Sequence, residues 1–342
     1  MTEPMPIPLP FQLSRMITSY WIPQSIYAAA ALGVADVLAD GPKPSAAIAR
    51  AVGANPDALH RLMRALVALE LCTATDDGAF ALAPLGNCLR SDTSDSMRAW
   101  ALLLGSEQHW RSWGRLVECI KTGRSVPELD GRDTWVEPSG DPTASDTFNH
   151  SMVQLTRHIA AAIAVSYDFS AFRTIVDVGG GFGALLPPIL KANPGLRGTV
   201  SDLPRCRDGA RAIAEKTRLA DRYDFVSGDF FVDPLPSADA YIIKSVIHDW
   251  DDERSVKILR NIRTAMGAES RLLVVEPIAP DRPGSTPFDA MMAHTDLNML
   301  VATGGRERTE ADFRGLIEKA GLEVTRIVPT PATISIIEGR RT

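Results

Sequence analysis

The sequence predicts an α/β protein with a doubly wound, mostly parallel seven-stranded sheet that ends in an antiparallel hairpin, together with a mainly helical N-terminal domain. Three observations predict this class. Short β-rich runs alternate with helical stretches after Arg173, two β-rich runs follow each other directly near the C-terminus, and the first ninety residues have helical periodicity. Alternating strands and helices are typical of a parallel sheet covered by helices on both faces.

The N-terminal region is expected to contain helices followed by a small hairpin. Helical periodicity predicts a first helix over residues 26–38, Ser45 begins a second, and Asn55 begins a third with leucines at helical spacing. The run CTATDDGAFALAP then alternates around Asp77-Gly78, which indicates a hairpin. This order of elements predicts a winged helix.

Charge argues against DNA as the partner of this winged helix. Between Ala31 and Arg90 the chain has five basic residues and six acidic ones. A DNA-binding module is expected to be basic. We therefore expect its apolar stripes to pack against a partner chain.

The whole chain has the composition of an ordinary globular protein without nucleic-acid or membrane partners. It has 342 residues, a formal net charge of -6 and four cysteines without CxxC spacing. An acidic chain disfavours nucleic acid, and no apolar run approaches the ~18 residues of a membrane helix. The start has no signal-peptide pattern, and the isolated cysteines indicate a reducing compartment. We expect a cytoplasmic protein.

Residues 97–166 are expected to be mostly helical, with an interruption at 127–142. The tryptophans of this segment more often belong to a core, but they also suit a wall against a flat aromatic ligand: Trp100, Trp110, Trp113 and Trp135. The predicted domains are residues 1–96 and 97–342. The second domain divides into a helical substrate-side segment, 97–166, and an α/β core, 167–342.

A glycine-rich turn follows the first core strand in VDVGGGFG. Asp177 precedes Gly179 by two residues, and an acid there disfavours pyrophosphate but suits an ammonium group. No GK[ST] follows, which excludes a P-loop. Gly179, Gly181 and Ala184 satisfy GxGxxA, so an NAD-dependent oxidoreductase stays open.

Two more acids end the next strands. Asp202 ends GTVSD, where an acid can accept hydrogen bonds from ribose hydroxyls. Asp229 stands before Phe230, and this pair of residues suits an adenine. Three acids at consecutive strand ends favour a cationic nucleoside without phosphate, S-adenosylmethionine. The alternative for each acid alone is a helix cap.

The fourth core strand leads to a catalytic candidate. Lys244 stands near its end, His248 follows in the loop, and a helix begins at Asp251-Asp252. Loops at the carboxyl ends of strands carry the chemistry in this architecture. A lone loop histidine is usually only solvated. Beside the cofactor crevice, His248 becomes a candidate general base, since histidine titrates near ~6.5.

The chain from about residue 25 to 337 resembles the caffeate and acetylserotonin class of S-adenosylmethionine-dependent O-methyltransferases, in particular its bacterial natural-product branch. The resemblance is carried by MRAWALLLGSEQHW, YDFS, VDVGGGFG, SDLP, GDFF, IIKSVIHDWDDE, LLVVEP and DLNMLVATGGRERTEADF. It implies a Rossmann-like core and a winged-helix dimerisation domain that contributes to the partner's pocket.

The resemblance also implies a role for each matching residue. The methionine end of the cofactor would lie against Asp177, Gly179 and Gly181. Asp202 and Leu203 would bind the ribose, and Asp229 and Phe230 would bind the adenine. Lys244 would close over the site. His248 would be the base, oriented by Glu276 and Glu307. The expected substrate-lining residues are Trp110, Met152, Asp249, Asn298 and Met299.

The acceptor is expected to be a small aromatic hydroxyl compound, and several alternatives stay open. TGRSVPELDG departs from the family pattern on the substrate side, so the acceptor cannot be carried over. Methylation of nitrogen or carbon would use the same cofactor site. His294 and Asp296 could chelate a metal, although His248 makes one unnecessary, and we expect none. A non-catalytic winged-helix protein that senses the cofactor is the last alternative.

Overall fold

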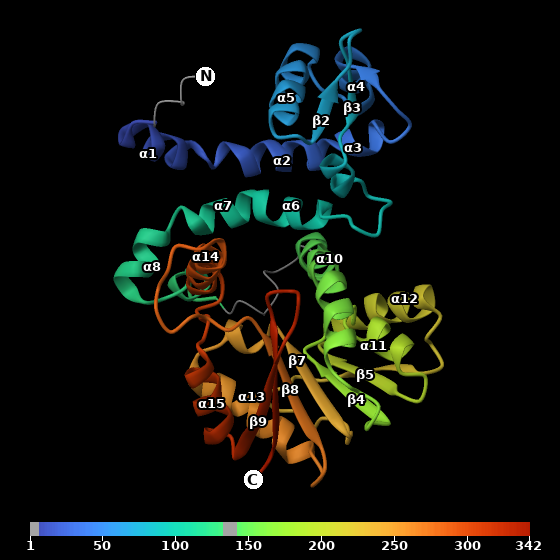
Figure 1. The fold of residues 1–342 in the computed structure, drawn as a ribbon, viewed down its shortest axis with the longest axis vertical. Coiled ribbons are helices and arrows are strands. Elements are labelled where there is room, and N and C mark those ends of the chain that lie inside the picture. Colours follow the sequence, from blue (N-terminus) through green and yellow to red (C-terminus); the bar gives the residue numbers. More distant parts are fainter. Residues whose placement is uncertain (1–6, 133–141) are drawn as a thin grey trace, which may run out of the picture. The chain divides into compact units, whose positions relative to one another are not determined.

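The computed structural model describes residues 7–132 and 142–342 and divides into two compact units (Figure 1). The first unit is residues 1–110 with 146–154, and the second is 111–145 with 155–342. Within the described ranges, no helix is both long and apolar enough to cross a membrane. Trp135 and most of the predicted interruption at 127–142 lie outside the described residues.

The first unit contains the helices and the hairpin that the sequence predicts. Its three-stranded antiparallel sheet has the order β1-β3-β2. The elements from its start through the segment that leads into the second unit are α1 (Leu9–Thr18), α2 (Trp21–Leu32), α3 (Val34–Val37), β1 (Lys43–Pro44), α4 (Ser45–Val52), α5 (Pro56–Ala68), β2 (Cys72–Ala74), β3 (Ala79–Leu82), η1 (Leu85–Leu89), α6 (Arg98–Gly105) and α7 (Glu107–Trp113).

The first predicted helix is wrong in its bounds. The helix expected over 26–38 begins earlier, at Trp21, and ends at Leu32, because Gly33 adopts a left-handed conformation with φ 72°. Its N–H donates to the carbonyls of Ala29 and Ala30, which closes the last turn. The third helix begins as predicted, since the Asn55 side chain accepts the N–H of Ala58.

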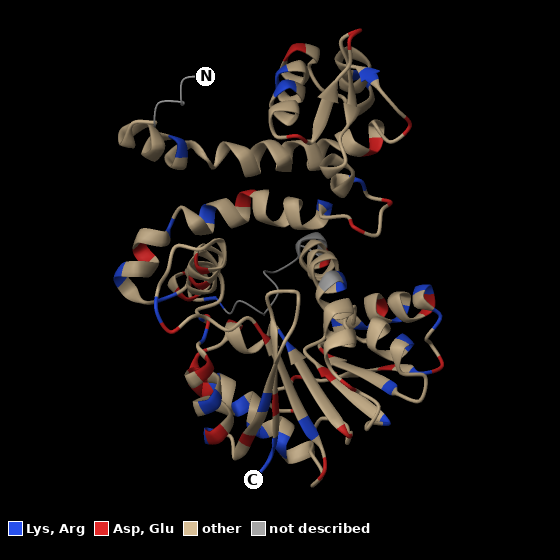
Figure 2. Cartoon of the chain, viewed as in Figure 1, with Lys and Arg blue, Asp and Glu red and all other residues tan. Residues whose placement is uncertain are grey.

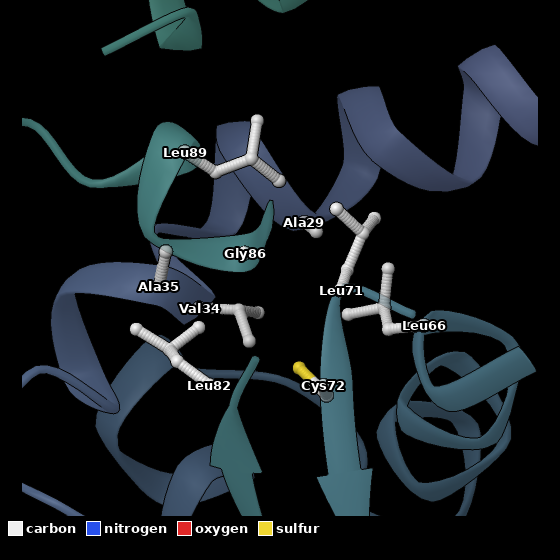
Figure 3. Close-up of a pocket in the computed structure, with 9 residues that line it drawn as sticks. All are labelled: Ala29, Val34, Ala35, Leu66, Leu71, Cys72, Leu82, Gly86 and Leu89. Carbon is white, nitrogen blue, oxygen red and sulfur yellow. The ribbon is translucent and has the colours of Figure 1, made fainter. Parts of the chain in front are cut away.

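Apolar side chains of the first unit form a core and also an exposed face. Figure 3 shows a small cavity in this core, lined by the Cys72 thiol and eight other residues: Ala29, Val34, Ala35, Leu66, Leu71, Leu82, Gly86 and Leu89. By contrast, α1 has no buried residue, and its large apolar side chains are exposed: Leu9, Phe11, Leu13, Met16 and Ile17. Arg15 is the single charge between Leu9 and Leu32 (Figure 2). Such a patch marks an interaction surface.

The second unit is built on the predicted seven-stranded sheet, whose order is β6-β5-β4-β7-β8-β10-β9. The first five strands in that order pair in parallel, and β10 pairs antiparallel with both β8 and β9. The strands are β4 (Thr174–Val178), β5 (Arg197–Asp202), β6 (Tyr223–Ser227), β7 (Ala240–Lys244), β8 (Arg271–Glu276), β9 (Leu322–Pro329) and β10 (Ser335–Arg341).

Helices and 3-10 turns connect the strands of the second unit. They are α8 (Leu116–Thr122), α9 (Val126–Leu129), α10 (Pro142–Ser166), α11 (Leu186–Ala192), η2 (Pro204–Cys206), α12 (Arg207–Thr217), η3 (Ile247–Asp249), α13 (Asp252–Ala265), α14 (Pro287–Ala302) and α15 (Glu310–Lys319). Residues 146–154 of α10 belong to the first unit, and the rest of this helix belongs to the second. In Figure 1, α11 and α12 accompany the β4 and β5 side of the sheet, and α13 and α15 the β8 and β9 side.

Burial on both faces explains the apolar strand runs. Along β4 and β7, Val176 and Tyr241 belong to one core cluster, whereas Ile175 and Ile242 belong to the other. A parallel strand covered on both sides is expected to be apolar at nearly every position. The chain runs outward from the central strand β4 through β5 to β6 and then returns to β7 on the other side of β4, so the strand order reverses between β4 and β7. Ligands bind at this switch point, outside the carboxyl ends of the strands.

Candidate active site

The glycine turn after β4 depends on positions that only glycine fills without strain. Gly179, Gly181 and Gly183 have φ of 67°, 58° and 74°. A Cβ on Gly183 would lie 1.6 Å from the Tyr223 hydroxyl, which itself donates to the Gly183 carbonyl at 3.1 Å. The turn is therefore held from behind by β6. Its N–H groups are bonded within the protein: Gly179 donates to the Ser201 carbonyl at 2.8 Å and Gly183 to the Gly180 carbonyl at 2.8 Å.

Asp177 lies beneath this turn. Its side chain is 1% exposed, and a Cβ on Gly180 would lie 2.5 Å from its Oδ2. Burial raises the pKa of Asp177 to about 7, and the nearby Lys244 opposes that shift. The Oδ2 atom has no hydrogen-bond partner. A buried carboxylate with an unmet acceptor suits a cationic group and does not suit a pyrophosphate.

Asp202 joins the end of β5 to the glycine turn. Its Oδ2 accepts the N–H of Gly181 at 2.6 Å, and its Oδ1 accepts the N–H of Leu203 at 2.6 Å. Burial raises the pKa of Asp202, and these two N–H groups oppose that shift. The Cys206 thiol also donates to this carboxylate, which opposes the raised pKa as well. A carboxylate has about four acceptor sites, so room remains for a ligand group. The structure therefore brings Gly181, Asp202 and Leu203 together.

Phe230 brings the end of β6 to the same turn. Its Cε1 lies 3.3 Å from the position of a Cβ on Gly179, and its ring centroid is 6.2 Å from that of Trp250. Asp229 orients this segment, because its Oδ1 accepts the N–H of Phe231 at 2.8 Å. An aromatic ring beside a strand-end carboxylate forms the wall expected of a base pocket.

Lys244, at the end of β7, interacts electrostatically with both parts of the site. Burial lowers the pKa of its ammonium, and the carboxylates of Glu276, Asp177 and Asp249 oppose that shift. Asp177 belongs to the turn after β4, whereas Glu276 and Asp249 surround His248. The lysine therefore offsets part of the negative charge of both groups.

His248 lies in η3 among three carboxylates. The Oε1 of Glu307 is 3.2 Å from its Nδ1, the Oε2 of Glu276 is 3.7 Å from the same atom, and the Oδ1 of Asp249 is 3.8 Å from its Nε2. The imidazole is 15% exposed. A carboxylate only accepts, so Nδ1 carries a proton and Nε2 is the basic atom of the neutral ring.

The carboxylates decide the basicity of this imidazole. Burial alone would lower the pKa of His248, but Glu276, Asp249 and Glu307 together outweigh it and raise the pKa to about 10. Burial also raises the pKa of Asp249 to about 7, although His248 opposes that shift. The protonation of His248 therefore depends on the charge of the carboxylates around it.

Glu276 fixes the backbone that carries His248. It is 0% exposed at the end of β8, and its Oε1 accepts the N–H groups of Val246 at 3.1 Å and Ile247 at 3.0 Å. Burial raises its pKa, with His248 opposing the shift. Its Oε2 and the Oε2 of Glu307 have no hydrogen-bond partner.

Sequence reasoning missed three residues that support the histidine. Asp296 accepts the N–H of Glu307 at 2.8 Å, Gly305 packs against the His248 carbonyl, and Arg308 is fully buried behind η3. The sequence indicates only a possible metal-chelating role for Asp296. The paired glycines of GGRERT were a signal for close backbone approach, but nothing in the local pattern indicates a buried arginine.

The expected substrate-lining residues are divided between the units. In the second unit, the Oδ1 of Asn298 accepts the indole N–H of Trp113 at 3.0 Å, Met299 is buried, and Asp249 lies beside His248. Trp110 and Met152 belong to the first unit. His294, the possible metal ligand, is exposed on α14. Among the described residues, no group of three or more His, Cys, Asp or Glu side chains could hold a metal.

Comparison with known families matches both parts of the chain. Residues 113–323 match the O-methyltransferase domain, and residues 14–92 match the O-methyltransferase dimerisation domain. The chain belongs to the O-methyltransferase family. It is therefore an S-adenosylmethionine-dependent O-methyltransferase, and the oxidoreductase and non-catalytic alternatives are not favoured.

Similar proteins extend over nearly the whole chain. The phenazine O-methyltransferase PhzM of Lysobacter antibioticus is 39% identical, covering 98% of this chain and 97% of the relative. A mitomycin biosynthesis 6-O-methyltransferase of Streptomyces lavendulae is 38% identical, covering 96% and 94%. The structure of human N-acetylserotonin methyltransferase in complex with S-adenosylmethionine superposes with a TM-score of 0.89 at 28% identity, covering 100% of this chain and 99% of that one. These matches confirm the predicted fold and family.

Proposed function

We propose that this enzyme methylates a hydroxyl group on a small aromatic acceptor, with His248 as the general base. The observation that carries the proposal is the imidazole set between Glu307, 3.2 Å from Nδ1, and Asp249, 3.8 Å from Nε2. This arrangement leaves Nε2 as the atom that can take a proton.

The residues at the strand ends suit the cofactor. Asp177 would hold the ammonium group through its unmet oxygen, Asp202 the ribose hydroxyls, and Asp229 with Phe230 the adenine. Gly179 and Gly181 let the backbone approach the methionine end, and Leu203 would cover the ribose. Lys244 would close over the site. When bound, S-adenosylmethionine supplies an electrophilic methyl group on a sulfonium.

The protein's own residues orient the acceptor and remove its proton. A phenol has a pKa near ~10, so it is mostly neutral at pH 7 and a weak nucleophile. The carboxylates around His248 raise its pKa well above that of a free imidazole, which makes Nε2 a stronger base toward a phenol. A base of this kind contributes about 10²–10⁴-fold to the rate. Glu307 and Glu276 hold the ring and stabilise its cation, as acids do in other acid–histidine pairs.

The acceptor pocket is proposed from the residue types and from the relatives. One relative acts on a phenazine and another in mitomycin biosynthesis, which supports a flat polycyclic acceptor for this chain. Met299, Asn298 and Asp249 of the second unit would line its pocket. Met152 and Trp110, which the sequence also assigns to acceptor binding, belong to the first unit. Methionine adapts to flat apolar ligands of different outline.

We propose a homodimer formed through residues 1–96, with the transferase domain over 97–342. The dimerisation match and the exposed apolar side chains of α1 support this assembly. None of the four cysteines forms a disulfide, which supports a cytoplasmic location. We propose that neither a metal nor nucleic acid takes part.

The test is transfer of labelled methyl from S-adenosylmethionine to a panel of phenols, hydroxyphenazines and matched aromatic amines. We expect transfer to a hydroxyl, insensitivity to EDTA, and loss of turnover in His248→Gln with retained binding of S-adenosylhomocysteine. The variant His60→Gln, at an exposed histidine of α5, is the control. Methylation of the amines alone, or full activity of His248→Gln, would contradict the proposal.

A further inference from the structure

Arg308 is a fully buried arginine behind the turn that carries His248. Its side chain is 0% exposed. The guanidinium donates from Nη1 to the Ile247 carbonyl at 2.7 Å and from Nη2 to the Trp250 carbonyl at 2.8 Å. It also donates from Nη2 to Oδ1 of Asp252 at 2.9 Å. The two carbonyls lie on either side of His248 in the chain.

A buried guanidinium is costly, so its contacts indicate what it does. Removing such an ion from water costs several kcal/mol unless its donors are satisfied. Its carboxylate partner, Asp252, has a side chain that is 47% exposed, so the ion pair is only partly shielded from water. The hydrogen bonds from the guanidinium to the two main-chain carbonyls are the buried contacts of Arg308. Arginine presents its donors in a rigid planar fork, which fixes the carbonyls relative to each other.

The loop that carries Arg308 also contacts His248 directly. The N–H of Arg306 donates to the His248 carbonyl at 2.8 Å. A Cβ on Gly305 would lie 2.0 Å from that carbonyl oxygen, so the two backbones are in direct contact. Glu307, which lies between Arg306 and Arg308 in the chain, has its Oε1 3.2 Å from Nδ1 of the imidazole. Residues 305–308 therefore hold both the ring and the main chain of His248.

We propose that Arg308 is a positioning residue of the transfer reaction, which acts through His248 by fixing the turn 247–250 against the loop 305–308. It touches neither the acceptor nor the cofactor in this role. Without Arg308, the distances from the imidazole to Glu307 and Glu276 would no longer be fixed, and Nε2 would no longer be oriented toward the acceptor. The inference rests on the proposed role of His248 as the base.

Arg308→Met and Arg308→Lys test the proposal. Methionine keeps an unbranched side chain but has no donor, and lysine restores a cation with only part of the fork. Misplacing a catalytic group by about 1 Å can cost ~10²-fold. We expect kcat to fall about 10- to 100-fold in Arg308→Met and less in Arg308→Lys, with S-adenosylhomocysteine affinity within twofold of the wild type. Arg314→Met, at an exposed ion pair of α15, should keep the wild-type kcat.

The pKa of His248 distinguishes a positioning role from a purely structural one, because replacing an arginine that only stabilises the fold would leave this pKa unchanged. A ring displaced from Glu307 and Glu276 loses the carboxylates that raise its pKa. NMR of labelled histidine, with the signal assigned through His248→Gln, should show a lower pKa in Arg308→Lys and a still lower one in Arg308→Met. If Arg308→Met does not fold, Arg308→Lys decides the matter alone.

Three results would overturn the inference: an unchanged kcat in the folded variants, an unchanged His248 pKa, or a loss of S-adenosylhomocysteine affinity as large as the loss of kcat. His248→Gln measured in the same assays separates this inference from the proposed function. If His248→Gln keeps full activity, the general-base role fails, while the titration still reports whether Arg308 fixes the ring.

Discussion

The Oε1 of Glu307 lies 3.2 Å from Nδ1 of His248, so an acid from the loop before α15 contacts a histidine from the loop after β7. These residues are 59 positions apart in the sequence. The contact fixes which ring nitrogen is basic, because the carboxylate accepts a hydrogen bond from Nδ1–H and leaves Nε2 free to take the proton of the substrate hydroxyl.

Glu307→Gln should lower kcat and leave cofactor affinity unchanged. The amide keeps the shape but has no charge to stabilise the imidazolium, so we expect kcat to fall by about 10–100-fold, or ~1.4–2.8 kcal/mol. Steady-state kinetics with saturating cofactor measures this loss. Glu310→Gln, in an exposed pair of α15, is the control. An activity within twofold of the wild type would remove Glu307 from the mechanism.

The pKa of His248 should depend on the charge of the bound cofactor. In the free protein the surrounding carboxylates raise this pKa to about 10. A positive sulfonium nearby disfavours the imidazolium and lowers the pKa, whereas the neutral thioether of the product does not. Histidine NMR should therefore give a lower pKa with S-adenosylmethionine than with S-adenosylhomocysteine.

The same shift sets the pH dependence of the reaction. A base must be unprotonated to act, so its raised pKa predicts that kcat/KM increases with pH from neutrality toward 10. Glu307→Gln removes a carboxylate that raises the pKa of His248, which should move the rise to lower pH. A value of kcat/KM that does not change between about pH 6 and pH 10 would argue against histidine as the base.

Asp177→Asn should stabilise the ligand-free protein while weakening cofactor binding. The folded pKa of Asp177, about 7, exceeds its unfolded value, so wild-type stability is lost as pH rises from the unfolded pKa toward 7. Asparagine does not ionise, so its advantage should be absent in acid and reach about 1–3 kcal/mol above neutrality. Urea unfolding at several pH values measures it. An advantage that does not grow with pH would contradict the assignment of a buried, unpaired carboxylate.

Asp202→Ala should weaken S-adenosylhomocysteine binding. The variant loses the acceptor of the Gly181 N–H at 2.6 Å as well as the proposed acceptor of the ribose. Hydrogen bonds to charged groups contribute about 1.5–3 kcal/mol, which corresponds to roughly a 10–100-fold loss of affinity. Calorimetry measures the change, with the exposed Asp224→Ala on β6 as the control. Equal affinities of the variant and the control would exclude Asp202 from the site.

Much of this site could be predicted because its residues follow strands. Asp177, Asp202 and Asp229 stand at or just after the ends of β-rich runs, and the carboxyl ends of parallel strands meet at one edge. His248 follows from the same rule one strand further. The insertion of β10 between β8 and β9 could not be predicted, because local periodicity does not specify which strands pair.

The supporting contacts could not be predicted, because they are tertiary. Gly33 ends α2 earlier than helical periodicity indicates, and no sequence pattern distinguishes this glycine from one tolerated inside a helix. Arg308 lies in a polar run, yet it is buried by residues 247–252, which are more than fifty positions away. Asp202 was expected to serve the ligand, and its contacts with Gly181 and Leu203 add a role in shaping the turn itself.

The most direct test of His248 as the base is a single-turnover measurement of methyl transfer to a good phenolic acceptor. His248→Gln and the wild type are compared at the same pH with the cofactor bound. We expect a rate lower by about 10²–10⁴-fold in the variant, with unchanged S-adenosylhomocysteine affinity. A single-turnover rate equal to that of the wild type would show that the proton leaves by another route, and the role assigned here to His248 would be wrong.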